Sequence, residues 1–396
     1  MHTIKRFGFT AYVLFFLLCA GLHPAQAGPT INFGDNAFLG IDFASQLYLQ
    51  TRDTGSGSDN DDRTSDIYFK RNRLMFRGMA GDKYGFYFAL NHRSARKIND
   101  LFVSDKGDDE LDVIDAFFIG DFTDAFRLRA GLTKDMLTRE NNEGCFDPLS
   151  MDRSLFIYTP LPRLSRDYGV VAWGNFLDAK LQYRLAVMRG FHDGNDPDSS
   201  FRYTARLHVS LLEPEYSIIY LGTYLGKKKV LTFGAGYQIE PDAVYANVAA
   251  KTLPKDYKAW TVDGFFEYPT SAGTFTISGA YLKTDFDDAY LGGDPDSRSI
   301  DIYGERNGWY AKAGYLFPMK VGPGELQVYG RYEDWKYAQL LNIFDQDLKW
   351  YGGGINYFIK GQDLRVTLEY SHTDFDQEDD NSKDFNTLTA MLQFRF

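Results

Sequence analysis

The chain alternates apolar and polar residues over many short segments, which is the pattern of β-strands with one apolar face. The last segment, residues 386–396, keeps this alternation to the final residue. The even-numbered positions are mainly apolar: Leu388, Ala390, Leu392, Phe394 and Phe396. The odd-numbered positions are mainly polar: Thr387, Thr389, Gln393 and Arg395. The pattern predicts a terminal strand with one apolar and one polar face, ending on an aromatic residue.

Sixteen segments fit this description, and short and long connections alternate between them. The predicted strands are 38–52, 67–80, 84–92, 111–120, 126–133, 167–174, 179–190, 201–212, 229–239, 257–268, 273–285, 306–317, 324–336, 348–359, 363–374 and 383–396. Two further stretches, 216–225 and 243–251, would raise the number to eighteen. We expect sixteen strands, with 213–228 an inner connection and 240–256 an outer loop.

An even number of amphipathic strands predicts an all-β fold, a closed transmembrane antiparallel β-barrel. Lipid cannot hydrogen-bond to an open sheet edge, so strands that span a bilayer must close on themselves. Aromatic residues make up 16% of the chain, with 27 Tyr and 33 Phe. A spanning barrel needs this richness for its lipid face and its interfacial girdles.

The first 27 residues predict a signal peptide that is cleaved, leaving residues 28–396 as the barrel. Lys5 and Arg6 precede an apolar run over 7–22, and residues 25–27 are small enough for cleavage. We therefore expect export to the outer membrane of a Gram-negative bacterium. Loss of two positive charges changes the formal charge from −11 to about −13, which argues against nucleic acid as a partner.

The longest connection, residues 134–166, is predicted to fold into the barrel as a constriction loop, because loops of this length are usually functional. Arginines occur in this loop and on the lumen parity of several strands. Guanidinium groups bind phosphate or carboxylate with paired donors and would lower the entry barrier for anions. The expected pore-lining residues are Arg71, Arg73, Arg127, Arg129, Arg153, Arg163, Arg166, Arg184, Arg202 and Arg206.

Other interpretations of the polar residues stay open. The arginines can instead pair with Asp and Glu across the lumen and fill it. His208 and Ser210 share the lumen parity, so a barrel hydrolase is conceivable, but no catalytic motif occurs, and we expect neither an enzyme nor a cofactor. Cys145 is the only thiol after the signal peptide, which excludes an internal disulfide and a cysteine-based metal site.

Two short motifs resemble the phosphate-selective porin O/P family, and a third resembles a basic segment of related porins. They are the basic strand segment 70–74 (Lys-Arg-Asn-Arg-Leu), the loop exit 165–170 (Ser-Arg-Asp-Tyr-Gly-Val) and the basic segment 227–231 (Lys-Lys-Lys-Val-Leu). The resemblance implies a sixteen-stranded trimeric porin whose constriction loop and wall arginines pass anions. The matching motifs transfer this role to Arg71, Arg73 and Arg166.

The expected function is therefore passive diffusion of small solutes, in particular anions such as phosphate, through a water-filled outer-membrane channel. The expected partners are outer-membrane lipid and lipopolysaccharide, small anionic solutes and two further copies in a homotrimer. The alternative is a barrel that sheathes a multihaem cytochrome and so carries electrons across the outer membrane. No haem-attachment motif occurs in the chain, so any haem would belong to the partner.

Overall fold

The computed structural model describes residues 28–34, 36–54, 62–98, 108–154, 165–192, 196–292, 295–380 and 382–396. The predicted signal peptide and Arg163 lie outside these ranges. Within them, no helix combines the length and the apolar character that a membrane span needs.

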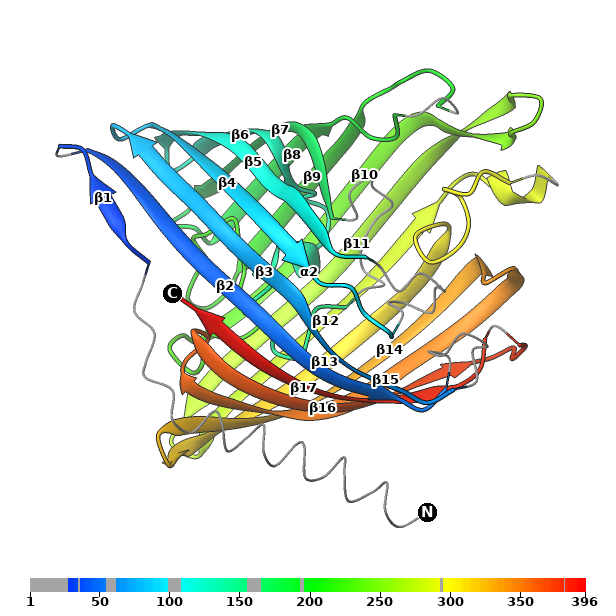
Figure 1. Cartoon of the computed structure of the whole chain (residues 1–396). Coiled ribbons are helices and arrows are strands. Elements are labelled where there is room, and N and C mark those ends of the chain that lie inside the picture. Colours follow the sequence, from blue (N-terminus) through cyan, green and yellow to red (C-terminus); the bar gives the residue numbers. More distant parts are fainter. Residues whose placement is uncertain are drawn as a thin grey trace, which may run out of the picture.

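Strands dominate the described structure (Figure 1). They are β1 (Thr30–Asn32), β2 (Ala37–Arg52), β3 (Thr64–Ala80), β4 (Tyr84–Arg93), β5 (Glu110–Thr123), β6 (Phe126–Lys134), β7 (Arg166–Phe176), β8 (Leu181–Met188), β9 (Arg202–Ser210), β10 (Val230–Asn247), β11 (Thr252–Thr270), β12 (Gly273–Asp285), β13 (Arg306–Val321), β14 (Gly324–Leu340), β15 (Ile343–Lys360), β16 (Leu364–Phe375) and β17 (Phe385–Arg395). A short helix, α2 (Arg139–Asn142), and a 3₁₀ turn, η1 (Ala289–Gly292), lie in connections.

Strands β2 to β17 form a closed barrel of sixteen antiparallel strands, which confirms the predicted fold. The closing pair is β17 with β2, in a register that runs from Thr387 opposite Arg52 to Arg395 opposite Ala44. The extra strand β1 pairs with the edge of β2 that also pairs with β17. Its partners are residues 38–40 of β2, whereas the pairing with β17 ends at Ala44. The blue strand β2 and the red strand β17 are neighbours in Figure 1.

The predicted outer loop at 240–256 is wrong, because this region forms the upper part of the β10–β11 hairpin. Pro241 has no backbone N–H to donate to a neighbouring strand, so the sequence here indicates the end of a strand. In the structure Asp242 has a φ of 45°. The strand instead continues through a bulge between Glu240 and Val244. The predicted inner connection is confirmed, since residues 211–229 contain no strand.

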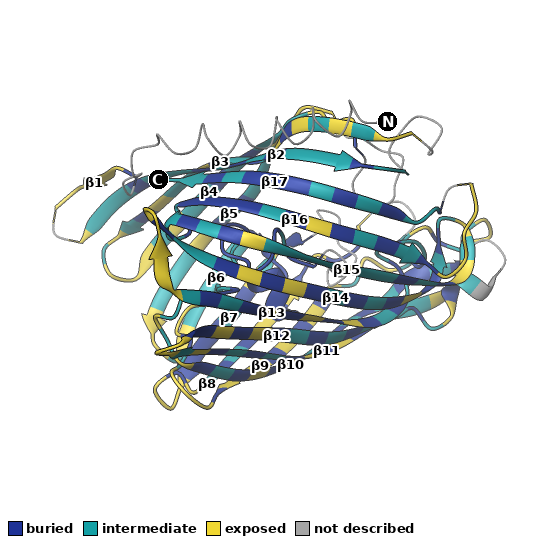
Figure 2. Ribbon diagram, turned by 90° about the horizontal axis from the view of Figure 1, so that it is seen from below, coloured by how far each residue is buried: buried dark blue, intermediate teal, exposed yellow. Residues whose placement is uncertain are grey.

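The two faces of the wall differ as the alternation predicts. In β9 the burial pattern alternates without interruption, with Arg202, Arg206 and His208 inside and Tyr203 and Leu207 outside. Figure 2 shows the same banding of buried and exposed residues along several other strands. Apolar side chains on the outer face suit lipid, while polar side chains fill the lumen.

Candidate functional site: a cavity beside the inward loop

The connection after β6 crosses the barrel interior, as predicted. Its residues 135–154 contact the opposite wall: Lys312 of β13 pairs with Glu140, and Ser154 donates to Glu333 of β14 at 2.5 Å. Asn356 of β15 donates to the Leu149 carbonyl oxygen at 2.8 Å. The loop is therefore fastened across the lumen rather than lying over its rim.

A second connection supports this loop from the other side. Segment 211–229, between β9 and β10, enters the barrel, where the Tyr220 amide donates to the Asn142 carbonyl oxygen and the Gly144 amide donates to the Tyr220 carbonyl oxygen, both at 3.0 Å. Arg139 donates both Nη groups to the Glu215 carboxylate at 2.7 and 2.8 Å. We call residues 211–229 the inner segment.

The Arg139–Glu215 pair is almost inaccessible to solvent. Burial acts to raise the pKa of Glu215, but Arg139 and the nearby His208 outweigh it and hold that pKa well below its usual value. Glu215 therefore remains ionised at neutral pH. Breaking such a pair is costly because it leaves one buried charge uncompensated.

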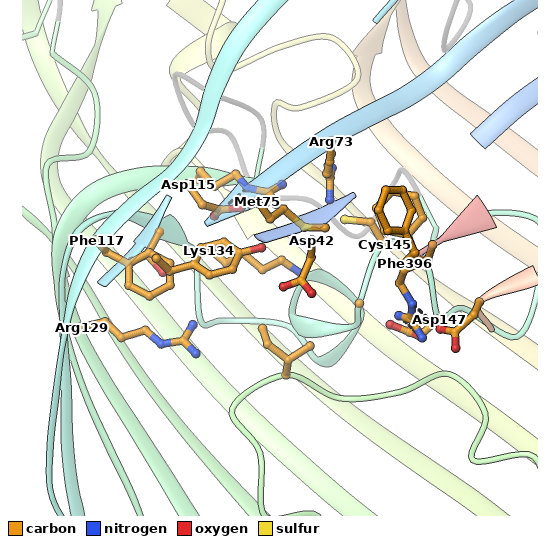
Figure 3. A pocket seen from close by; sticks show the side chains of 18 residues that line it. Asp42, Arg73, Met75, Asp115, Phe117, Arg129, Lys134, Cys145, Asp147 and Phe396 are labelled. Atoms are coloured by element: carbon orange, nitrogen blue, oxygen red, sulfur yellow. Dashed lines mark hydrogen bonds and ion pairs between the residues drawn. The ribbon is translucent and has the colours of Figure 1, made fainter. Parts of the chain in front are cut away.

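A cavity of about 410 Å³ lies between the loop and the wall formed by β2 to β6, and we call it the loop cavity. Its charged lining is shown in Figure 3. The cationic residues that line it are Arg73, Arg129, Lys134, Arg166 and Arg395, and the acidic residues are Asp42, Asp115, Asp147 and Asp363.

The acids of this lining are all in ion pairs. Asp115 pairs with Arg166 at 3.2 Å, and Asp42 pairs with Arg77 at 2.9 Å. The remaining two, Asp147 and Asp363, pair with Arg395 at 3.0 and 2.9 Å. Three arginines therefore offset most of the charge of these four carboxylates, since Asp147 and Asp363 share Arg395.

Three cations of the lining have no carboxylate partner within the described residues. Arg73 donates its Nε to the Asn91 side-chain oxygen at 3.1 Å, and Lys134 donates its Nζ to the Glu143 carbonyl oxygen at 2.6 Å. Arg129 lies over the Phe117 ring, with its Cζ 4.8 Å from the ring centroid. The loop cavity therefore holds basic side chains that no carboxylate neutralises.

The rest of the lining is mainly apolar. Met75, Tyr87, Phe117, Phe146 and Ile219 line the same cavity. The guanidinium of Arg73 lies over Phe146 at 5.3 Å, as Arg129 lies over Phe117. A cation that stacks on a ring face keeps the donors at its planar edge available for another group.

Cys145 also lines the loop cavity and is 4% exposed. Figure 3 places its sulfur close to Arg73. Burial acts to raise the pKa of this thiol, but Arg153, Arg73 and Lys134 lower it well below its usual value. The Cys145 thiol is therefore acidic, and its ionised form offsets part of the positive charge of Arg73 beside it.

Two further cavities lie along the lumen. One of about 570 Å³ shares Asp147, Asp363 and Arg395 with the loop cavity and lies toward the end of the barrel where the short turns are. Another of about 110 Å³ lies on the long-loop side and is lined by Lys70, Asp152 and Arg153, among others. The loop lies between this outer cavity and the loop cavity.

The structure places the predicted arginines in different parts of the barrel. Arg73, Arg129 and Arg166 line the loop cavity. Arg71 reaches the loop, donating to Gln46 and to Asp152 at 2.6 Å each. Arg153 lies within the loop and donates to its carbonyl oxygens. Arg127 lies near the β5–β6 turn, where it pairs with two acids, Asp121 and Asp124.

The remaining described arginines lie on the other side of the lumen, away from the loop cavity. Arg202 pairs with Glu240 at 2.6 Å and Arg206 pairs with Asp263 at 2.7 Å, all four side chains being at most 2% exposed. Arg184 stacks on Tyr220 of the inner segment. His208 is buried beside the same tyrosine, with ring centroids 4.9 Å apart.

Sequence reasoning did not single out Lys134 or the inner segment as parts of the site. Lys134 is the last residue of β6 and lies five residues after Arg129. An odd spacing gives the two residues opposite parity, so the alternation does not predict that both line one cavity. A signal for the inner segment was its length, since the other short-turn connections contain only a few residues.

A closed sixteen-stranded barrel with an inward loop and a cation-lined cavity defines the class: an outer-membrane porin, a channel for small solutes. The family profile described as phosphate-selective porin O and P matches residues 50–396. The chain therefore belongs to the phosphate-selective porin O and P family.

Solved structures share the fold at low sequence identity. Salmonella typhi OmpF in complex with daunomycin matches at a TM-score of 0.59, with 12% identity over 93% of this chain and 100% of that one. The anion-selective porin from Comamonas acidovorans matches at 0.55, with 10% identity over 91% and 100%. The trimer form of OmpT from Vibrio cholerae matches at 0.50, with 13% identity over 91% and 100%. No curated protein sequence matches the chain.

Proposed function

We propose that this porin passes small anions in preference to cations and that the loop cavity is where it selects them. The observation that carries the proposal is the pair of arginines, Arg73 and Arg129, which have no carboxylate partner among the described residues while the acids beside them are paired. The phosphate selectivity for which the family is named and the anion selectivity of the Comamonas porin support the same charge preference.

Net charge does not oppose this proposal. The chain is acidic overall, but charges exposed to solvent are screened beyond about 8–10 Å at physiological salt. The cations of the loop cavity lie next to the solute inside a narrow space, where screening is weaker. They therefore influence a passing ion more than the acids of the outer loops do.

The test is the reversal potential of the purified protein in a planar bilayer under a potassium chloride gradient. We expect wild type to favour chloride, and Arg129→Gln to reduce this preference. One unit charge acting on an ion at about 4 Å is worth about 1 kcal/mol in water and about 4 kcal/mol near a protein surface. Taking the lower value for each ion, loss of the charge disfavours chloride and favours potassium by about 1 kcal/mol each, so the chloride-to-potassium permeability ratio falls about thirtyfold.

Arg127→Gln is the matched control, because Arg127 precedes Arg129 by two residues on the same face of β6 but is paired with Asp121 and Asp124 near the turn. We expect it to leave the ratio within about twofold of wild type, since its acids are exposed and screened. A cation-selective wild type, or equal effects of the two variants, contradicts the proposal.

The cytochrome-sheath alternative is less favoured. Residues 135–154 and the inner segment cross the lumen and are hydrogen-bonded to the wall and to each other. A folded electron-transfer domain would need to displace both. Small solutes need only the cavities that remain.

We further propose a homotrimer that buries the wall of β6 to β9. Strands β6 and β9 have nine residues and β8 has eight, at or just below the lower end of the about 9–11 that a tilted spanning strand needs. The wall is lowest here, and association is one way to cover a low wall. The outer face here has an apolar groove lined by Val170, Leu185, Tyr203 and Tyr237, and the Vibrio OmpT structure is described as a trimer.

Native mass spectrometry of Leu185→Trp tests this interface. The larger side chain should obstruct packing in the groove and shift the protein to monomer. Ile277→Trp, on the outer face of β12 and equally exposed at 53% against 52% for Leu185, should keep the wild-type oligomer. A monomeric wild type would refute the trimer.

A further inference from the structure

We propose that the loop cavity binds small aromatic carboxylates, so that the preferred solute is an organic anion rather than an inorganic one. The inference rests on the proposed anion preference and names the class of anion. Three properties of the cavity lead to it: its size, the division of its lining into a cationic and an apolar part, and the way its arginines are held.

The size exceeds what an inorganic anion needs. A volume of about 410 Å³ lies within the range of about 300–1,000 Å³ that is usual for sites of small organic ligands. An oxyanion such as phosphate would leave most of this space to water. A benzoate-sized solute would fill much more of it while still passing along the lumen.

The lining offers an apolar surface that an inorganic anion cannot use. Phe117, Phe146, Met75 and Ile219 come from β5, from the loop, from β3 and from the inner segment. An apolar group that binds against these side chains displaces the water there, and removing apolar surface from water is favourable. A phosphate ion gains the charge interaction alone.

The arginines are held so that a carboxylate can meet them at the edge. The guanidinium carbons of Arg73 and Arg129 lie over the rings of Phe146 and Phe117 at 5.3 and 4.8 Å, while Arg73 also hydrogen-bonds to Asn91 and Cys145. The rings restrain each guanidinium, and the terminal N–H donors of Arg129, for which no hydrogen bond occurs among the described residues, can bind a carboxylate with two hydrogen bonds. The aromatic body of such a solute then lies beside the rings that hold the arginines.

Affinity is measured by calorimetry on the purified protein in detergent, with benzoate, acetate, benzyl alcohol and inorganic phosphate as probes. Benzoate and acetate share the carboxylate, so their ratio isolates the apolar body, and benzyl alcohol keeps the ring without the charge. We expect benzoate to bind about tenfold or more tightly than acetate and phosphate, since burial of even part of a ring is worth this much. Benzyl alcohol should bind more weakly than benzoate.

Two pairs of variants place the site. Phe117→Leu removes a ring that is 8% exposed and lines the cavity, whereas Phe118→Leu makes the same change at the next residue, which is 75% exposed on the outer face. Arg129→Gln and Arg127→Gln form the charge pair used above. Phe117→Leu should weaken benzoate about fivefold and leave phosphate unchanged, Arg129→Gln should weaken both anions, and the two controls should change neither.

The outcomes separate this inference from the proposed function. If phosphate binds as tightly as benzoate, or if Phe117→Leu leaves the benzoate affinity unchanged, the aromatic carboxylate is wrong, while a chloride-favouring reversal potential would still uphold the anion channel. A cation-selective wild type would overturn both. Block of the potassium chloride current by benzoate at lower concentration than by acetate gives an independent confirmation.

Discussion

Replacing Glu215 by Gln tests whether the inner segment supports the constriction loop. The substitution keeps the shape of the side chain but removes the bidentate carboxylate of Arg139, which is fully buried and keeps only the more distant Glu143 at 3.9 Å. Removing one partner of a buried ion pair costs about 3–5 kcal/mol. The amide of Gln still accepts one hydrogen bond, so we take the lower value, about 3 kcal/mol.

This energy acts on the local opening of the inner segment, because the barrel strands make their own hydrogen bonds. About 3 kcal/mol corresponds to roughly a hundredfold larger open population. The amides of Tyr220 and Gly222 report on it, since they donate to Asn142 and Asp147 of the loop at 3.0 Å each. Hydrogen exchange measured by mass spectrometry should therefore speed up by about a hundredfold in these peptides.

Glu213→Gln is the control, because Glu213 lies two residues earlier in the same segment, is exposed, and accepts only a backbone amide hydrogen bond among its described contacts. It should change exchange by no more than about threefold, as surface changes of about 0.5 kcal/mol do. Unchanged protection of Tyr220 in Glu215→Gln would refute the supporting role. Because the pKa of Glu215 is lowered, the pair is stabilising above the usual carboxyl pKa and is lost only as pH falls through the lowered value, so wild type should keep its protection at pH 5.

Four further results are expected. Purified protein should give a β-dominated circular dichroism spectrum and a gel mobility that changes on boiling, and a mainly helical spectrum would contradict the barrel. Deleting Phe396 should reduce the folded form in outer membranes, because its backbone exchanges two hydrogen bonds with Phe43 at 2.8 and 2.9 Å; normal levels would show that this residue is dispensable. Arg71 lowers the pKa of Asp152 to about 2 in spite of burial, so the Arg71–Asp152 pair should persist as pH falls from 7 to 4, and Asp152→Asn should increase chloride preference relative to wild type at both ends of that range; equal preferences of the two proteins at pH 4 would contradict a persistent pair. Alkylation of Cys145 by iodoacetamide should already be near its maximal rate at pH 7, because the thiol pKa is lowered, and Arg73→Gln should shift the midpoint of the rate upward in pH; a midpoint near that of a free thiol in wild type would contradict the cationic environment.

Much of the fold follows from local rules that can be read along the chain. Alternation with period two marks each wall strand, and the requirement for closure turns sixteen strands into a barrel. The prediction failed at Pro241–Asp242, where a residue that normally ends a strand is accommodated by a bulge. It also omitted β1, whose three residues are too few to show a period.

The site was less accessible from the sequence, because it depends on contacts between distant residues. Parity placed Arg73 and Arg129 on the lumen side, but it could not reveal that the acids beside them are already paired. Equal parity also grouped them with Arg202 and Arg206, which the structure places in buried ion pairs on the other side of the lumen. Only the path of the loop and the inner segment distinguishes the two groups.

The arrangement of β1 and β17 on β2 has a consequence for the connectivity of the chain. The Phe43 amide donates to the carbonyl oxygen of Phe396, and the Ile41 amide donates to that of Pro29, so the two ends of the barrel accept from positions two residues apart on one strand, about 7 Å. Strand β1 therefore follows β17 along the same edge of β2 and in the same direction, with a break in the chain between residues 396 and 28. A circular permutant that joins residue 396 to residue 28 by a short linker, and opens the chain in a long loop, should preserve every strand pairing of the wall.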